Sequence, residues 1–141
     1  MNIKIFIQHS PCKLSGSDLV IDCYPPYGFV TTPGTTIISP NYPNYYPSND
    51  ISYCQVTLIF EDRISIEFES FDVGSDGSCS LDWFRVFDGN SSDSPLIGSK
   101  LCGKYRPRPM ESSGNSMTLE FRPYHGGSFK GFKVVAYQGN N

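Results

Sequence analysis

The chain has 141 residues, of which 14% are aromatic, and it contains 13 glycines, 11 prolines and a formal net charge of −3. Its length predicts one domain with a two-layer core that needs no metal or cofactor for stability. The many aromatic residues, glycines and prolines favour short strands over long helices. The charge gives no reason to expect nucleic-acid or polyanion binding, and no apolar run approaches the roughly 18 residues of a membrane span.

The first 33 residues have the least regular pattern. Residues 3–7 alternate and are able to form a strand, but this apolar region is too short for a signal peptide and has no small-residue cleavage site. We therefore expect that the chain is a piece of a longer protein or that its own signal has been lost.

From residue 34 onward, strand-like and turn-like segments alternate. Residues 35–38 are β-branched and predict a short strand, and the prolines within residues 40–47 predict a rigid loop fixed by its tyrosines. Further strands are predicted at residues 55–60, 64–69, 81–87, 116–121 and 132–137, with a short edge segment at residues 96–101. Polar or glycine- and proline-rich turns separate them, at residues 61–63, 74–78, 88–90 and 105–109. Short strands at this spacing predict an all-β sandwich.

Five cysteines, at positions 12, 23, 54, 79 and 102, are the strongest sign of where the protein works. In a small all-β chain they predict an oxidising, extracellular compartment and hence a secreted protein. No Cys-x-x-Cys pair is present, so the cysteines do not predict a zinc site.

Several segments resemble the CUB domain family of extracellular modules. The matches are Ser39-Pro40-Asn41-Tyr42-Pro43 with Tyr46-Pro47, Cys79-Ser80-Leu81-Asp82, Val86-Phe87-Asp88-Gly89, Leu96-Ile97-Gly98 before Leu101-Cys102-Gly103, residues 112–121, and Gly131-Phe132. They cover about residues 23–138 in the family's order. The resemblance implies a two-sheet antiparallel jelly-roll sandwich over 23–138, with an N-terminal extension at 1–22 and a tail at 139–141.

The resemblance also implies the disulfides Cys23–Cys54 and Cys79–Cys102, each of which closes a loop worth roughly 3 kcal/mol in the chain-entropy model. Cys12 is then unpaired: it is free, bonded to another chain, or bonded to a cysteine in a missing segment. A competing interpretation pairs Cys12 with Cys54 and leaves Cys23 over. The extension carrying Cys12 is either an assembly arm, acting by strand addition or a bridge between chains, or a disordered leader.

Many CUB domains hold calcium with carboxylates at one end of the sandwich, and the resemblance locates these positions here. Asp82 matches one of the carboxylates and Tyr46 matches the supporting tyrosine, but the other two carboxylates fall on Gly74 and on about Tyr124. Calcium takes six to eight oxygen ligands, so the sequence predicts no calcium site and no cofactor unless Asp76 bends inward. The alternative role of Asp82 is to cap its loop by accepting hydrogen bonds from backbone N–H groups.

No catalytic site is predicted, because the two histidines, His9 and His125, have no acidic partner in a recognisable motif. The candidate binding loops carry Tyr42, Tyr45, Tyr46 and Tyr124, since tyrosines make good interface anchors. Packing of these tyrosines beneath their own prolines is the alternative. Asn90-Ser91-Ser92 is a glycosylation acceptor in a predicted turn.

Together these observations predict a non-enzymatic extracellular module that binds another protein or assembles with itself. A secreted glycan-binding domain and a non-catalytic module of a secreted protease are the alternatives.

Overall fold

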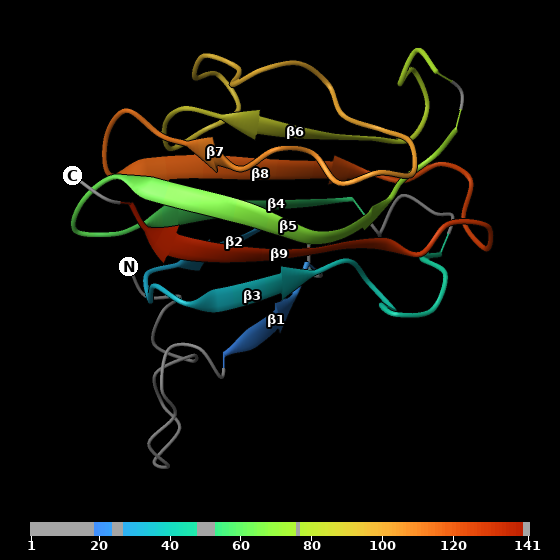
Figure 1. Cartoon of the computed structure of the whole chain (residues 1–141), viewed down its shortest axis with the longest axis horizontal. Helices are drawn as coiled ribbons and strands as arrows, with labels where there is room; N and C mark the ends of the chain where they lie inside the picture. The colour runs from blue at the N-terminus through green and yellow to red at the C-terminus, as the bar shows by residue number, and fades with distance from the viewer. Residues whose placement is uncertain (1–18, 24–26, 48–52, 76, 140–141) are drawn as a thin grey trace.

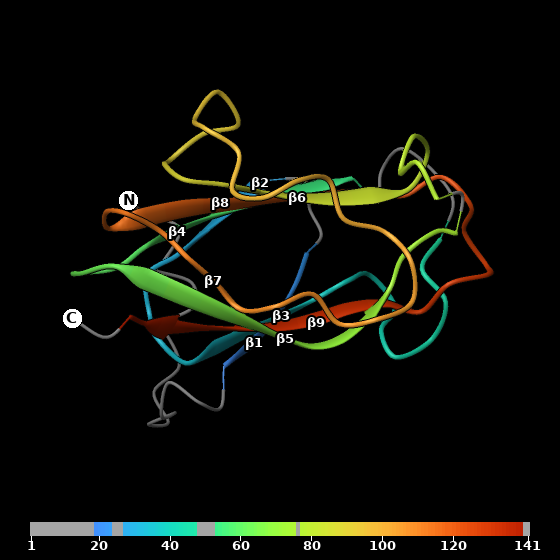
Figure 2. The same ribbon diagram turned by 45° about the horizontal axis from the view of Figure 1, so that its top comes forward.

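The computed structural model describes residues 19–23, 27–47, 53–75 and 77–139, and in them two β-sheets face each other (Figures 1 and 2). The five-stranded sheet has the order β1-β3-β9-β5-β7, and the four-stranded sheet has the order β2-β4-β8-β6. The strands are β1 (Val20–Asp22), β2 (Tyr27–Val30), β3 (Thr35–Ile38), β4 (Cys54–Ile59), β5 (Ile64–Asp72), β6 (Trp83–Phe87), β7 (Met110–Glu111), β8 (Ser116–Arg122) and β9 (Gly131–Gln138). The predicted all-β two-sheet sandwich is confirmed.

One detail of the sheets differs from the prediction, because two strand pairs are parallel. β1 pairs with β3 and β2 pairs with β4 in parallel, whereas all other pairs are antiparallel. The first four strands alternate between the two sheets, so every second strand runs in the same direction and meets its neighbour in parallel. The five-stranded sheet thus begins at Val20, inside the predicted N-terminal extension. Cys12, His9 and residues 3–7 lie outside the described residues, as do Asp76 and the last two residues of the tail.

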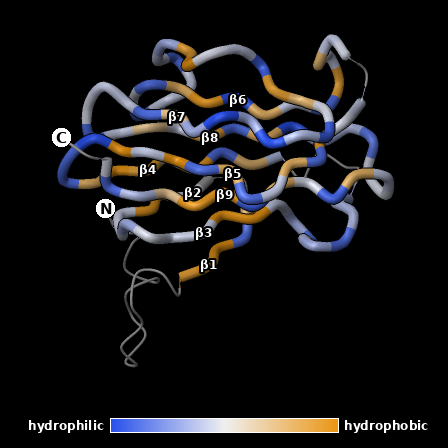
Figure 3. The backbone as a smooth tube through the Cα atoms, in the orientation of Figure 1, coloured by the Kyte–Doolittle hydropathy of each residue, from blue (hydrophilic) through white to orange (hydrophobic). Residues whose placement is uncertain are grey.

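The core consists of the inward rows of both sheets, which follow the alternation seen in the sequence (Figure 3). Phenylalanine rings from both sheets meet edge to face at its centre: Phe84 lies 4.7 Å from Phe132, and Phe132 lies 5.0 Å from Phe121, between ring centroids. A shift of register in β5 between Phe68 and Ser70 lets Phe68 and Phe71 both face inward. Such a bulge turns a strand's side chains without ending its pairing.

The outward row of the four-stranded sheet is more buried than the alternation predicts. Trp83 and Phe87 are buried, but they lie outside the central cluster that contains Phe84 and Val86. The guanidinium of Arg85 covers both rings, 4.2 Å from the centroid of Trp83 and 5.3 Å from that of Phe87. These aromatic rings are therefore shielded by a charged neighbour rather than by the opposite sheet.

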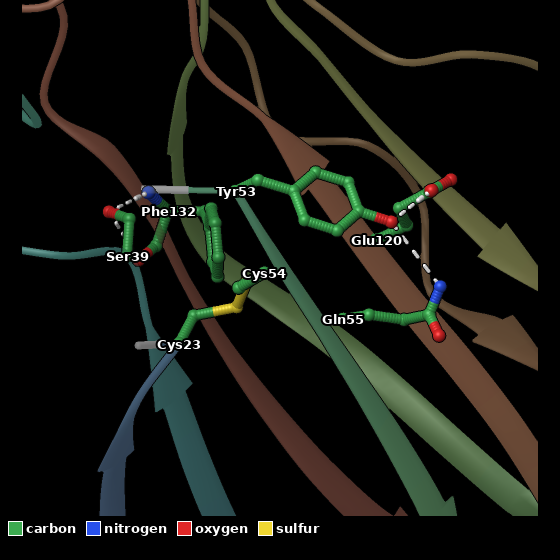
Figure 4. Close-up of a disulfide and its surroundings, with 7 residues drawn as sticks. All are labelled: Cys23, Ser39, Tyr53, Cys54, Gln55, Glu120 and Phe132. Carbon is green, nitrogen blue, oxygen red and sulfur yellow. Dashed lines mark hydrogen bonds between the residues drawn. A yellow bond between two sulfur atoms is a disulfide. The ribbon is translucent and has the colours of Figure 1, made fainter. Parts of the chain in front are cut away.

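The Cys23–Cys54 disulfide ties the sheets together where the chain leaves β1 and where β4 begins (Figure 4). The Cα atoms of the pair are 5.5 Å apart, and both residues are buried. Nearby, the Ser39 hydroxyl accepts a hydrogen bond from the Phe132 backbone N–H at 2.9 Å. This contact requires Gly131 beside it, because a Cβ there would lie 1.9 Å from the Ser39 oxygen and φ is +85°.

The segment expected to form an edge at residues 96–101 makes only isolated bridges, from Leu96 to Phe87 and from Leu101 to Phe84. Cys102 follows this segment and is bonded to Cys79, with 5.4 Å between their Cα atoms. The described part of the chain has no helix with the length and hydrophobicity of a membrane span.

Candidate functional site

Three loops meet at the end of the sandwich that lies on the right in Figure 1. They are residues 39–47 after β3, residues 73–82 before β6, and residues 123–130 between β8 and β9. Backbone hydrogen bonds join the first to the third, from the Tyr46 N–H to the Phe129 carbonyl at 3.0 Å and from the Gly127 N–H to the Tyr46 carbonyl at 2.8 Å. The end of the sandwich is therefore one connected unit rather than three separate loops.

Asp82 is the centre of this unit and is only 1% exposed. Its Oδ2 accepts hydrogen bonds from the Tyr46 hydroxyl and from the backbone N–H groups of Tyr124 and His125, each at 2.8 Å. Its Oδ1 lies 2.7 Å from Nδ1 of His125. Asp82 does accept hydrogen bonds from backbone N–H groups, as its alternative role has it, but these groups belong to residues 123–130 and not to its own loop.

Tyr46 is fully buried at the base of the unit, which corrects the prediction that it is a surface anchor. Its ring packs edge to face on Phe121 at 5.1 Å and stacks with Phe129 at 6.3 Å. Burial, and then the hydrogen bond to Asp82, raise the pKa of Tyr46 far above its usual value. Tyr46 therefore packs into the end of the sandwich, on Phe121 and Phe129, instead of presenting its ring to solvent.

His125 has the acidic partner that its sequence motif did not reveal. The loop at residues 123–130 brings His125 onto Asp82, 43 residues earlier in the chain, a distance at which no sequence motif could show the partner. Its side chain is 46% exposed, so one face of the imidazole reaches solvent. The sequence offered one sign of this contact: His125 lies next to Tyr124, the position at which the family resemblance expects a carboxylate.

The donors around Asp82 do not fit a calcium ion. Its Oδ2 already accepts hydrogen bonds from one hydroxyl and two backbone N–H groups, and its Oδ1 lies against the imidazole of His125. A Cβ at Gly74 would lie 2.8 Å from the Cβ of Asp82, so an acidic side chain has no room at that position. No group of three or more His, Cys, Asp or Glu side chains comes together among the described residues. Calcium takes six to eight oxygen ligands, several of them carboxylates, and the hydrogen bonds of Asp82 already engage both of its oxygens.

Two of the predicted binding-loop tyrosines do reach the surface of the unit. Tyr45 is 49% exposed and Tyr124 is 53% exposed, whereas Tyr42 is half-buried. Tyr124 packs edge to face on His125 at 5.0 Å. The Asn41 side-chain amide donates to the Tyr45 carbonyl at 2.9 Å, which fixes the turn that presents Tyr45. The unit thus presents an exposed aromatic surface on a buried hydrogen-bonded base.

Residues 26–136 match the family model described as CUB domain. The chain belongs to the CUB domain family. It is 37% identical to mouse Tolloid-like protein 2 over 107 residues, which is 76% of this chain and 10% of that protein. It is also 37% identical to human cubilin over 107 residues, 76% of this chain and 3% of cubilin. The CUB domain therefore spans only a small part of these relatives.

Solved structures agree with this assignment. The calcium-bound CUB2 domain of MASP-1 is 29% identical, with a TM-score of 0.61 over 72% of this chain and 89% of that one. A CUB domain is a non-catalytic module, and CUB domains with disulfides are typically extracellular.

Proposed function

We propose that this CUB domain is an extracellular, non-enzymatic module that binds another protein, or a second copy of itself, through its loop end. The observation that carries the proposal is the pair of exposed tyrosines, Tyr45 and Tyr124, on a base held by Asp82. Interfaces gain most of their affinity from a few aromatic anchors on surfaces that are already ordered. The hydrogen bonds of Asp82 supply that order here.

We further propose that this domain uses no calcium at its loop end. The calcium-bound MASP-1 CUB2 domain shows that relatives carry the ion, but here Tyr46 and His125 already occupy the carboxylate of Asp82. Through these contacts the Asp82 carboxylate links the loops of Tyr46 and His125 directly. In calcium-bound members of the family, a Lys or Arg of the partner reaches the acidic residues that hold the ion. Without the ion, this domain would have to bind its partner in a different way.

Calcium titration tests this part directly. A calcium site filled at a hundredfold excess over its Kd would raise the free energy of unfolding by about 2.7 kcal/mol. We expect the melting temperature to be the same in calcium and in a chelator, and no heat of binding by calorimetry. A calcium-dependent rise of several degrees would overturn the proposal.

The tyrosine surface is tested by the double variant Tyr45→Ser, Tyr124→Ser. Its matched control is Tyr137→Ser, which removes a 39% exposed tyrosine from β9. Each protein is immobilised and exposed to a panel of purified extracellular proteins, and self-association is followed by sedimentation velocity. We expect the double variant to lose at least tenfold in affinity for any partner that the unaltered chain binds, and the control to lose none. Equal binding by all three proteins would exclude the loop end.

The exposed Asn90 lies in the loop after β6, and we propose that it carries a glycan in an oxidising secretory pathway. Expression in a eukaryotic secretion system should give a product whose mass falls on treatment with an N-glycanase. The variant Asn90→Gln should show no such change.

A further inference from the structure

A strongly basic segment, residues 100–108, follows β6 and lies outside the loop end just described. It contains four of the chain's 11 cations, Lys100, Lys104, Arg106 and Arg108, and no acidic residue occurs between Asp93 and Glu111. All four side chains are exposed, and none forms an ion pair with a described residue. A segment with a charge of +4 therefore lies on a chain whose net charge is −3.

The backbone of this basic segment is fixed to both sheets of the sandwich. Leu101 exchanges two hydrogen bonds with Phe84 in β6, at 2.8 and 2.9 Å, and Gly103 exchanges two with Val73 next to β5, at 2.6 and 3.0 Å. The Cys79–Cys102 disulfide holds the residue between them. Pro107 and Pro109 then restrict the backbone on either side of Arg108. In Figure 2 the segment crosses from β6 toward β7 along one edge of the sandwich.

An open cleft of about 650 Å³ lies beside this segment and the Cys79–Cys102 disulfide. Lys100 and Arg108 line it, together with Tyr105, whose side chain is among the most exposed in the described part of the chain at 71%. The Lys100 ammonium donates a hydrogen bond to the Cys79 carbonyl at 3.2 Å and lies 5.4 Å from the centroid of the Trp83 ring. Glycines at positions 77, 98 and 103 also line the cleft, and they have no side chains that would fill it.

We propose that the cleft and the basic segment bind a sulfated glycosaminoglycan chain. Lysine and arginine bind oxyanions such as sulfate strongly, and the ring of Tyr105 offers an apolar face to a sugar. Lys104 and Arg106, which do not line the cleft, would contact further sulfates along the same linear chain. This inference is independent of the proposed protein-binding function, because no residue of the tyrosine surface lines the cleft.

The chemistry of the surface favours this ligand over other anions. A protein interface is centred on buried apolar anchors, whereas this cleft has two exposed cations, Lys100 and Arg108, beside an exposed tyrosine and otherwise mostly small or neutral residues. Binding to a linear polyanion instead adds many charge contacts and releases counterions. In the extracellular compartment typical of disulfide-bonded CUB domains, the abundant linear polyanion is sulfated polysaccharide. Net charge alone gave no reason to expect polyanion binding, because it averages over a charge that is unevenly distributed.

The proposal is tested by titrating a heparin octasaccharide into the full chain at several salt concentrations. The test variant is Lys104→Gln, Arg106→Gln, Arg108→Gln. The matched control, Arg63→Gln, Lys130→Gln, Lys133→Gln, removes the same charge from residues outside both the basic segment and the cleft. The altered side chains are half-buried or exposed, so both variants should keep the melting temperature of the unaltered protein within a few degrees.

We expect the test variant to lose at least tenfold in affinity, with a slope of log K against log salt that is shallower by about 2. The control should lose less than threefold. Tyr105→Ala should weaken binding without changing the salt dependence. Equal losses in the test and control variants would mean that only net charge matters and would overturn the proposal.

Two further ligands decide between sources of negative charge. A desulfated heparin octasaccharide should bind at least tenfold more weakly than the sulfated one, and poly-glutamate should bind weakly too. Equal binding of the desulfated sugar, tighter binding of poly-glutamate, or no binding of heparin at low salt would each overturn the assignment. The Tyr45→Ser, Tyr124→Ser variant should bind heparin normally, so failure of the protein-binding proposal would remain distinguishable.

Discussion

Replacing Asp82 by Ala should be one of the most destabilising single changes in the domain. The carboxylate accepts three hydrogen bonds on Oδ2 and contacts the His125 imidazole through Oδ1, all between 2.7 and 2.8 Å. Its removal leaves the hydroxyl of the fully buried Tyr46 and two backbone N–H groups without their acceptor. Each buried group left unsatisfied costs about 1–3 kcal/mol. We expect a loss of about 4 kcal/mol or more in the free energy of unfolding, a large part of the 5–15 kcal/mol of a typical domain.

A milder variant and a double-mutant cycle make this reasoning specific. Asp82→Asn keeps the shape but exchanges charge-assisted hydrogen bonds for neutral ones, and should cost about 2–3 kcal/mol. Tyr46→Phe should cost about 1.5–3 kcal/mol in the unaltered chain. In the Asp82→Ala background it should cost nothing, because the hydroxyl no longer has its acceptor.

Urea denaturation at pH 7 with the disulfides intact measures these free energies. The reasoning is refuted if Asp82→Ala costs less than 1 kcal/mol, or if the effects of Asp82→Ala and Tyr46→Phe simply add. His125→Gln serves as an internal comparison, because it removes the imidazole and keeps the backbone N–H group of residue 125. It should cost less than Asp82→Ala.

Three further outcomes are expected. Burial raises the pKa of Tyr46 in the folded state, so the contribution of its hydroxyl to the free energy of unfolding is complete below the unfolded pKa of about 10 and is lost progressively above it. In that alkaline range the unaltered chain should lose about 1.4 kcal/mol per pH unit relative to Tyr46→Phe. Equal alkaline slopes of the two proteins in urea titrations would contradict this. Gly74→Ala should cost at least 1 kcal/mol, because φ is +60° and the added Cβ meets Asp82 at 2.8 Å; an unchanged melting temperature would show that the loop relaxes freely. Glu120 is 6% exposed and accepts two hydrogen bonds from Arg85, at 2.9 and 3.1 Å. Glu120→Gln should therefore lower the free energy of unfolding by about 1–2 kcal/mol and change the fluorescence emission of Trp83, the only tryptophan. Unaltered emission would mean that Arg85 keeps its place without Glu120.

The sequence alone determined the architecture, because the features that decide it are local. The alternation of Val56, Leu58 and Phe60 with polar neighbours marks an inward row in any sheet that buries one face. The prolines around Tyr46 exclude a helix or central strand, and the ordered CUB motifs restrict how the strands connect. Asp82 as a cap was also predictable, since the residue type and its place after Cys79 suit that role.

Only the tertiary structure decided what surrounds these residues, because contacts between distant loops leave no periodic pattern in the sequence. His125 contacts Asp82 across 43 residues, and the burial of Tyr46 depends on Phe121 and Phe129. The Arg85 stack makes an outward strand face partly buried, which alternation cannot predict. Net charge is an average over the chain, whereas binding depends on local potential. The basic segment became a candidate site only when the fold placed it beside an open cleft.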